Sequence, residues 1–173
     1  MILHSAPNLF PADQRDHDRV GVAGKDLAGA AHAQRFTAHH RLLKPYEYEQ
    51  VFNATGQRRV PGAAPVPAPP PGSGYQSSQG GVMLRARRNG GDLPRLGLII
   101  SKKSIKRAVD RNRVKRITRE SFRLRQSRLS GLDVVVMSRA GLGELPGPAL
   151  RVILDKHWDA LARWMERWKR EQR

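Results

Sequence analysis

Apolar residues recur at helical spacing near the middle of the first half of the chain. In residues 45–53, Tyr48, Val51 and Phe52 fall on one face of a short helix. Pro45 suits the first turn of such a helix, because its missing N–H has no partner to lose there. This pattern predicts a short amphipathic helix that lays one face on the rest of the fold.

Two longer helices are predicted in the second half of the chain. Residues 108–129 place apolar or small side chains three and four positions apart, at Val114, Ile117, Ser121, Phe122 and Leu124 or Leu129. A last helix is predicted after residues 146–148, and its apolar stripe comprises Leu150, Ile153, Leu154, His157, Trp158, Leu161 and Met165. On that stripe His157 is interpreted as a packed histidine.

Three shorter runs predict strands, at residues 81–88, 95–101 and 133–138. Residues 89–92 (Asn-Gly-Gly-Asp) join the first two runs as a turn. Leu98, Ile99 and Ile100 are consecutive, which is typical of a central strand covered on both faces. The order of helix, strands, helix, strand and helix predicts an α/β (α+β) two-layer sandwich with a small central sheet.

The remaining stretches favour a single domain with two additions. Residues 1–34 show little periodicity and are predicted to be a mobile N-terminal extension. Residues 61–81 contain six prolines together with Gly, Ala and Ser, and predict a flexible insertion that does not pair as a strand. Since neither flank of this insertion has enough apolar residues for its own core, residues 35–173 are interpreted as one domain.

Charge changes this picture from a small fold to a binding protein. The 173 residues carry a formal net charge of +17, with a sequence pI near 11.5. Residues 102–128 alone hold twelve Lys or Arg against Asp110 and Glu120. Such a concentration of like charge repels itself, and a polyanion relieves that repulsion.

Several chemistries are disfavoured by the same composition. The chain has no Cys, which excludes disulfides, thiolate metal ligands and cysteine nucleophiles. No run approaches the roughly 18 apolar residues that span a bilayer, so no membrane role and a cytoplasmic location are expected. His39 and His40 have no carboxylate at ligand spacing, and no carboxylate pair suggests a two-metal nuclease held by protein. No catalytic residue is therefore predicted.

One face of the predicted central helix forms a ridge of cations. Arg111, Lys115 and Arg119 repeat every four residues, and a rise of about 1.5 Å per residue lets such a ridge meet several phosphates. The flanking cations are Arg113, Arg116 and Arg123. The alternative is a basic face that only keeps the protein in solution. Such faces usually carry carboxylates four residues away, and this helix has few, so the ridge favours nucleic-acid binding.

The same segment resembles the signature of the bacterial ribonuclease P protein family. The resemblance rests on Ser-Lys-Lys at 101–103, Ala-Val-Asp-Arg-Asn-Arg-Val-Lys-Arg at 108–116 and Arg-Glu-Ser-Phe-Arg at 119–123. Arg-Leu-Leu-Lys-Pro at 41–45, followed by Tyr48 and Phe52, is similar to the opening helix of the family. Thr118 departs from the family pattern, because many relatives have an aliphatic residue there.

The resemblance implies a fold and a set of binding residues. The fold is ribosomal protein S5 domain 2-like, with a left-handed βαβ crossover where general rules predict a right-handed one. The residues implied to face the catalytic RNA are Lys102, Lys103, Arg107, Arg111, Asn112, Arg113, Lys115, Arg116, Arg119 and Arg123. Tyr48 and Phe52 are implied to line a cleft for the single-stranded leader of precursor tRNA; core packing of both rings against the sheet is the alternative.

The resemblance also implies a function. The chain is expected to be the protein subunit of ribonuclease P, with one protein per RNA, and to help the holoenzyme, an endoribonuclease, remove the 5′ leader of precursor tRNA. The catalytic centre and its Mg²⁺ ions are expected in the RNA rather than on protein side chains. A ribosomal protein or a general RNA chaperone is the alternative. A DNA-binding module is disfavoured, because the basic arc is too broad for a recognition helix.

Overall fold

The structure is a computed structural model that describes residues 35–56, 74–171 and 173. Its main elements are α2 (Pro45–Ala54), β1 (Gly74–Gln79), β2 (Val82–Arg88), β3 (Arg95–Ile99), α3 (Ala108–Arg123), β4 (Leu132–Ser138) and α4 (Gly147–Glu171). Short 3₁₀ turns lie at Ala38–His40, Gln126–Leu129 and Leu142–Glu144. The predicted extension at 1–34 and most of the predicted insertion at 61–81 lie outside the described residues.

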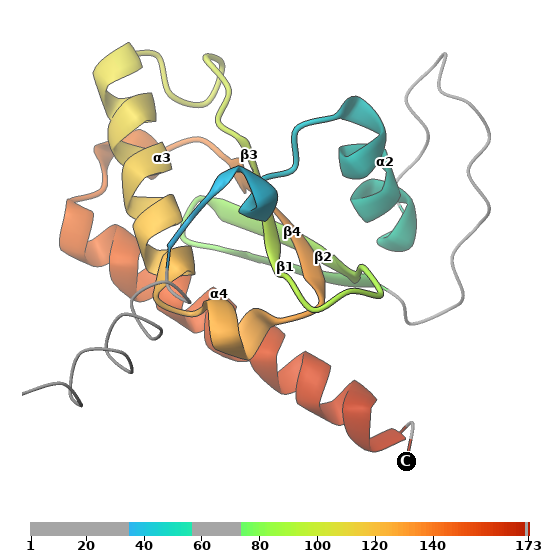
Figure 1. Cartoon of the computed structure of the whole chain (residues 1–173). Coiled ribbons are helices and arrows are strands. Elements are labelled where there is room, and N and C mark those ends of the chain that lie inside the picture. The colour runs from blue at the N-terminus through green and yellow to red at the C-terminus, as the bar shows by residue number, and fades with distance from the viewer. Residues whose placement is uncertain (1–34, 57–73, 172) are drawn as a thin grey trace, which may run out of the picture. The chain divides into compact units, whose positions relative to one another are not determined.

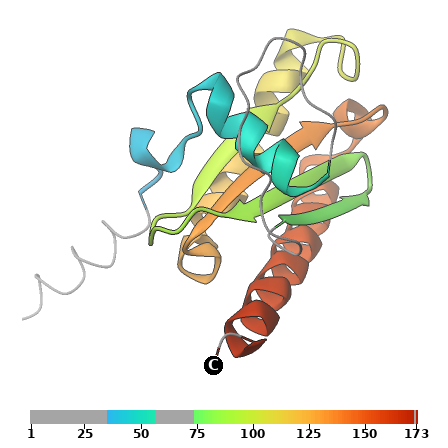
Figure 2. The same cartoon turned by 90° about the vertical axis from the view of Figure 1, so that its right-hand side faces the viewer.

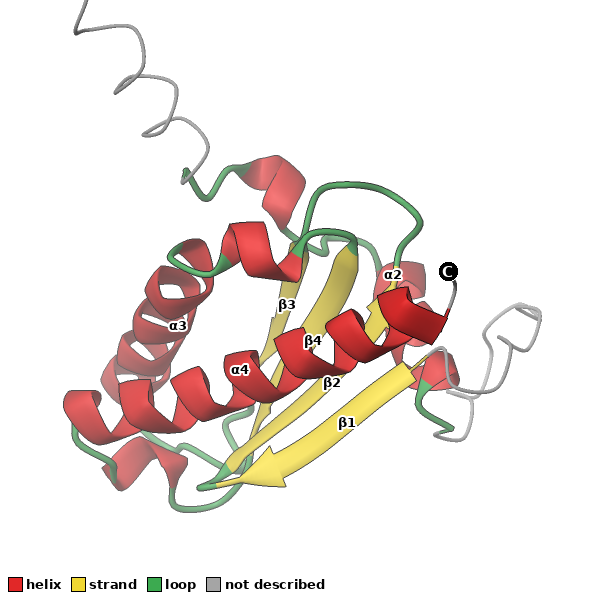
Figure 3. Cartoon of the chain, turned by 90° about the horizontal axis from the view of Figure 1, so that it is seen from below, coloured by secondary structure: helices red, strands yellow, loops and turns green. Residues whose placement is uncertain are grey.

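Four strands form one mixed sheet in the order β1-β2-β4-β3. β2 pairs antiparallel with β1 and with β4, whereas β3 pairs in parallel with β4. The β3–α3–β4 connection therefore joins adjacent parallel strands, and it crosses over in the left-handed sense (Figure 3). The predicted α/β fold with a small central sheet is confirmed, including the crossover that general rules disfavour.

Helices cover the two faces of the sheet unequally. In Figure 2, α2 lies in front of the sheet, and α3 and α4 lie behind it. Figure 1 shows α4 running along its face of the sheet and extending past it towards the C-terminus. The α2 side is thus covered by one short helix, and the other side by two longer ones.

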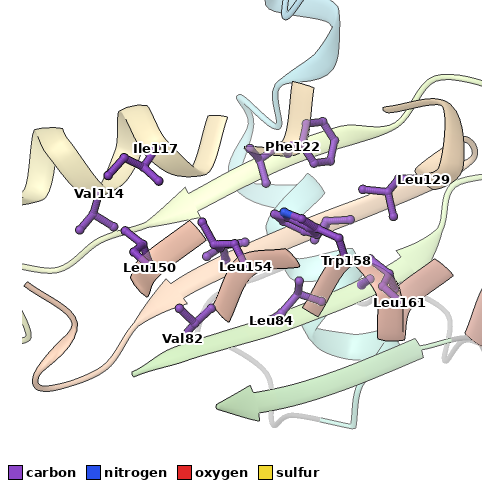
Figure 4. Packing of buried hydrophobic residues seen from close by; sticks show 14 of the residues in the cluster. Val82, Leu84, Val114, Ile117, Phe122, Leu129, Leu150, Leu154, Trp158 and Leu161 are labelled. Atoms are coloured by element: carbon purple, nitrogen blue, oxygen red, sulfur yellow. The ribbon is translucent and has the colours of Figure 1, made fainter. Parts of the chain in front are cut away.

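The main core lies between the sheet and the α3/α4 pair. Alternation along β2 sends Val82 and Leu84 into it, and both are fully buried (Figure 4). Phe122 of α3 meets Trp158 of α4 edge to face, with 5.8 Å between ring centroids. The indole N–H of Trp158 donates a 2.8 Å hydrogen bond to Ser121 Oγ, so this large side chain leaves no polar atom unpaired.

Two strand predictions were wrong. β1 occupies residues 74–79 inside the predicted insertion, because pairing with β2 orders a polar segment that has no apolar alternation of its own. β3 is an edge strand rather than a central one: Ile99 is 37% exposed, whereas Ile100 follows the strand and enters the core. The central strand covered on both faces is β4.

The turn at 89–92 and the end of the central helix also differ from expectation. The turn connects β2 to β3, but β4 lies between these strands, so it closes no hairpin. α3 ends at Arg123, six residues before the predicted end at Leu129. Leu129 is still buried, on the following 3₁₀ turn, whereas Leu124 is half exposed.

Candidate RNA interface

The position of α3 is set by its buried face. Val114, Ile117 and Phe122 pack into the core, which leaves the cation-rich arc of the helix outward. Thr118, the departure from the family pattern, is buried as well. Its hydroxyl donates a 2.9 Å bond to the Val114 carbonyl one turn earlier, so the polar substitution leaves no unpaired group in the core.

Three of the predicted RNA-binding arginines are engaged within the protein. Arg111 donates to the carbonyls of Ile105 and Lys106, at 3.0 and 2.6 Å. Arg113 donates to the Leu145 and Gly143 carbonyls, at 2.8 and 2.6 Å, and so ties α3 to the loop before α4. Arg123 pairs with Glu120 at 2.7 Å. The structure therefore gives these arginines a share in holding the fold together.

The other predicted RNA-binding residues are available to a ligand. In the described part of the chain, no hydrogen bond or ion pair engages the side chains of Lys102, Lys103, Asn112, Lys115, Arg116 or Arg119. Arg107 lies 3.7 Å from Asp110 but is 77% exposed, and such surface pairs are worth little. These seven side chains, six cations and the neutral Asn112, lie on α3 and the loop before it, and we call them the open cationic set.

A cavity of about 720 Å³ lies beside this set, between α3 and the start of α4. Its lining residues are Phe36, Arg113, Arg116, Ile117, Arg119, Glu120, Arg123, Gly147, Pro148 and Arg151. Five arginines therefore face one carboxylate, and the amino end of α4 adds a partial positive charge. Phe36 and Arg151 were missed from the sequence, because each lies more than 20 residues from the basic motif and joins it only through the fold.

Tyr48 and Phe52 belong to α2, which covers the opposite face of the sheet from α3. Both rings are half-buried against the small cluster of Leu42, Val51 and Val135. The Tyr48 hydroxyl donates a 3.0 Å bond to the Leu42 carbonyl, and burial raises the pKa of Tyr48, so the phenol stays neutral. Each ring thus combines packing with partial exposure, between the two alternatives that the sequence left open.

An ionic network fixes α2 on this face. Asp133 is fully buried on β4 and accepts bonds from Arg95 at 2.7 and 2.8 Å, from Arg87 at 3.0 Å and from Asn89 at 3.0 Å. Arg95 also reaches Glu47 of α2 at 2.7 Å. Burial raises the pKa of Glu47, but the N–H groups of Lys44 and Leu43 and the Arg95 charge outweigh it and leave that pKa below its ordinary value.

Arg85 was also missed from the sequence. Its side chain is 4% exposed on the α2 side of β2, where its guanidinium lies 5.6 Å from the Phe52 ring centroid. Nη1 donates to Thr55 Oγ1 at 2.9 Å, whereas Nε is buried without a partner. No ion pair to a carboxylate compensates this charge among the described residues.

The described ranges contain neither a cluster of metal ligands nor a membrane-spanning helix. No group of three or more His, Cys, Asp or Glu side chains there could hold a metal ion. No helix among those residues is long and apolar enough to cross a membrane.

Comparison with known proteins places this geometry in a family. The family model for Ribonuclease P matches residues 72–162, about half of the chain. The ribonuclease P protein component of Pseudomonas putida is 44% identical over 132 residues, which cover 76% of this chain and 84% of that protein. That of Pseudomonas aeruginosa is 44% identical over 129 residues, covering 74% and 82%.

A solved structure agrees at the level of the fold. The RNase P protein of Staphylococcus aureus superposes with a TM-score of 0.53 at 21% identity, covering 68% of this chain and 90% of that one. The sequence relatives and the family model carry the assignment itself, and the residues matched by the family model include α3 and all four strands. This chain belongs to the ribonuclease P protein family.

Proposed function

We propose that this chain, as the protein component of ribonuclease P, binds the ribonuclease P RNA through α3 and holds the 5′ leader of precursor tRNA against the α2 face. The observation that carries the first part is the open cationic set. Seven side chains on one helix and its entry loop face outward. Among the described residues, the only carboxylate that pairs with any of them is Asp110, a weak partner of Arg107. A polyribonucleotide backbone supplies the missing negative charge.

The cavity beside α3 supports an extended RNA contact rather than a single phosphate. Arg116 and Arg119 belong both to the open cationic set and to the cavity lining, and Arg151 adds a cation from α4. Guanidinium groups spread along a groove can each engage a different phosphate in a bidentate manner. We therefore place the backbone of the catalytic RNA along the α3/α4 groove.

The α2 face suits an unpaired strand. Tyr48 and Phe52 offer partly exposed rings on which bases stack with little sequence preference. Arg85 adds a cation beside Phe52. These features support leader binding there and would let one protein serve precursors with different leaders.

The hydrolytic step is assigned to the RNA partner. The open cationic set cannot hold Mg²⁺, which takes oxygen ligands, and we propose that the RNA binds that ion. The protein would act by screening repulsion between the two RNAs and by holding the leader. One protein per RNA and a cytoplasmic location complete the proposal. No observation favours a ribosomal or general chaperone role over this one.

The test is cleavage of precursor tRNA by ribonuclease P RNA at low magnesium, with and without the wild-type chain. Accurate cleavage at the 5′ end should require the protein, and the complex should bind precursor tRNA more tightly than mature tRNA. A folded wild-type protein that neither stimulates cleavage nor distinguishes the two tRNAs would contradict the proposal and favour a general RNA-binding role.

A further inference from the structure

A second cavity, of about 580 Å³, lies at the carboxyl ends of the two parallel strands. It is lined by Gly81, Ser101, Lys103, Ser104, Ser138, Arg139 and Ala140. Ser138 ends β4, and Ser101 and Ser104 lie in the loop that follows β3. Because β3 and β4 are parallel and adjacent, both segments leave the sheet at the same edge (Figure 1). Ligands of sheet proteins commonly bind at such an edge.

The three serine hydroxyls form a connected chain. Ser104 Oγ lies 2.5 Å from Ser101 Oγ and 2.6 Å from Ser138 Oγ. The backbone N–H groups of Ser101 and Ser104 also donate to hydroxyl oxygens in this chain, at 3.1 Å each. Those donors occupy lone pairs on Ser138 and Ser101. The Ser104 hydroxyl has three acceptors in reach: Ser138 Oγ, Ser101 Oγ and, at 3.3 Å, the Ser101 carbonyl. When Ser101 donates to Ser104 and Ser104 donates to Ser138, the Ser138 hydroxyl has a proton left to donate into the cavity.

The charges at the cavity are of one sign. Lys103 and Arg139 are exposed, and neither forms an ion pair within the described ranges. Arg139 instead lies 3.8 Å from the sulfur of Met83, on the α2 side of the sheet. Arg85 and Arg139 repel each other: burial and the nearby charge of Arg139 lower the pKa of Arg85, and among the described residues no carboxylate pairs with either guanidinium. An anion at this edge would relieve that repulsion.

We propose that this cavity, the serine pocket, binds one phosphodiester group of RNA. Lys103 and Arg139 neutralise the phosphate, and the serine chain donates a hydrogen bond to one of its oxygens. The pocket joins two regions of the interface, since Lys103 belongs to the open cationic set on one side and Arg139 reaches the α2 face on the other. This inference rests on the proposed function and adds a defined phosphate site to it.

The phosphate can come from either RNA, and the two sources are separable. Arg139→Gln removes the cation without disturbing a hydrogen bond that holds the backbone. Arg163→Gln on α4 is the matched control, because Arg163 is exposed, has no ion pair among the described residues and lies on another element. Affinity is measured for ribonuclease P RNA alone, and then for precursor and mature tRNA with each assembled complex.

We expect Arg139→Gln to weaken one of these affinities by about tenfold, the loss typical of one charge-assisted contact. A loss for ribonuclease P RNA alone assigns the phosphate to the catalytic RNA. A loss confined to precursor tRNA assigns it to the leader. In the second case, neutral methylphosphonate linkages placed one at a time in the leader should weaken wild-type binding at one linkage, and Arg139→Gln should show no further loss there.

Ser104→Ala is the second variant, because it interrupts the hydroxyl chain without changing charge, and it should weaken the same affinity by a smaller factor. The proposal is overturned when Arg139→Gln and Ser104→Ala, both folded by circular dichroism, bind every RNA as Arg163→Gln does. Failure of the proposed function is distinct, because the wild-type chain itself would then not bind ribonuclease P RNA selectively.

Discussion

The face of the sheet under α3 and α4 is closed by apolar side chains, whereas the face under α2 combines a small apolar cluster with a network of charges. On the first face, Phe122 and Trp158 are buried and their polar neighbours are paired. On the second, a buried carboxylate, Asp133, anchors Arg95 and Arg87, whereas Arg85 pairs with no carboxylate among the described residues. Apolar burial stabilises the fold by itself, whereas an uncompensated buried cation invites an anionic ligand. The inner surface of α3 and α4 thus holds the fold and leaves the outer surface of α3 for RNA, whereas the α2 face combines packing with exposed binding groups.

The largest loss of stability is expected from a cavity in the apolar core under α3 and α4. Phe122→Ala removes a fully buried ring that contacts Phe36 and Trp158 edge to face, and it should lower the free energy of unfolding by about 3–5 kcal/mol. Urea unfolding followed by circular dichroism measures the loss. A cost below about 1 kcal/mol would show that this face does not carry the stability assigned to it.

On the α2 face, the largest loss of stability is expected from replacing Asp133. Asp133→Ala leaves Arg87 and Arg95 without their shared partner, and we expect a loss of about 3 kcal/mol in the same unfolding experiment. Asp159→Ala is the control, because Asp159 pairs with Arg125 and Arg128 but its side chain is 38% exposed, and it should cost less than about 1 kcal/mol. Equal losses would mean that burial of the network adds nothing.

Phe52→Ala sharpens the comparison, because Phe52 is the aromatic counterpart of Phe122 on the other face. Its ring is only half-buried, so the loss of stability should be about 1–2 kcal/mol. Affinity of the assembled complex for precursor tRNA should fall about tenfold through the loss of one stacked base, while affinity for mature tRNA is unchanged. Equal losses for both tRNAs would place Phe52 in the core alone.

The smallest effect concerns pH. His157 is buried and its Nδ1 lies 2.6 Å from Ser77 Oγ; burial lowers its pKa below the ordinary value of 6.5, although a bond to the Gln79 carbonyl opposes the shift. The unfolded chain therefore binds a proton more readily than the folded one, and stability should fall as the pH drops below about 6.5. The pKa of Glu47 is also lowered, but its contribution is lost only below about pH 4.5.

Between about pH 7 and pH 5, His157→Gln should therefore flatten the pH dependence of the unfolding free energy. Denaturant unfolding at several pH values measures it. An unchanged slope in this variant would show that another group titrates in that range.

Much of the apolar face could be predicted from the sequence, because periodicity reports burial on one side of an element. Leu150, Leu154 and Trp158 at helical spacing predicted the buried stripe of α4 correctly. Periodicity failed where order comes from a neighbour. β1 is polar, and it is held by pairing with β2 and by contacts such as Ser77 with His157.

The binding residues were harder to predict, because charge alone does not show what a cation contacts. Arg111 and Arg113 stand in the same motif as Lys115, yet Arg111 holds carbonyl groups of the loop before α3 and Arg113 holds those of the loop before α4. Arg85 and Arg151 reach the interface only through the fold, so no local pattern marks them. The sequence thus identified the basic helix, and the structure divides its cations into those that hold the fold and those left open.

That division is tested most directly by the salt dependence of binding to ribonuclease P RNA. Lys115→Gln/Arg116→Gln/Arg119→Gln removes three members of the open cationic set, and Arg163→Gln/Arg167→Gln/Lys169→Gln removes the same charge from exposed positions of α4. The α3 variant should lose about 100-fold or more in affinity, and the slope of log K against log salt should shrink by about 2–3, while the α4 variant stays near wild type. Equal losses in the two variants would contradict the account, because net charge rather than the α3 surface would then drive binding.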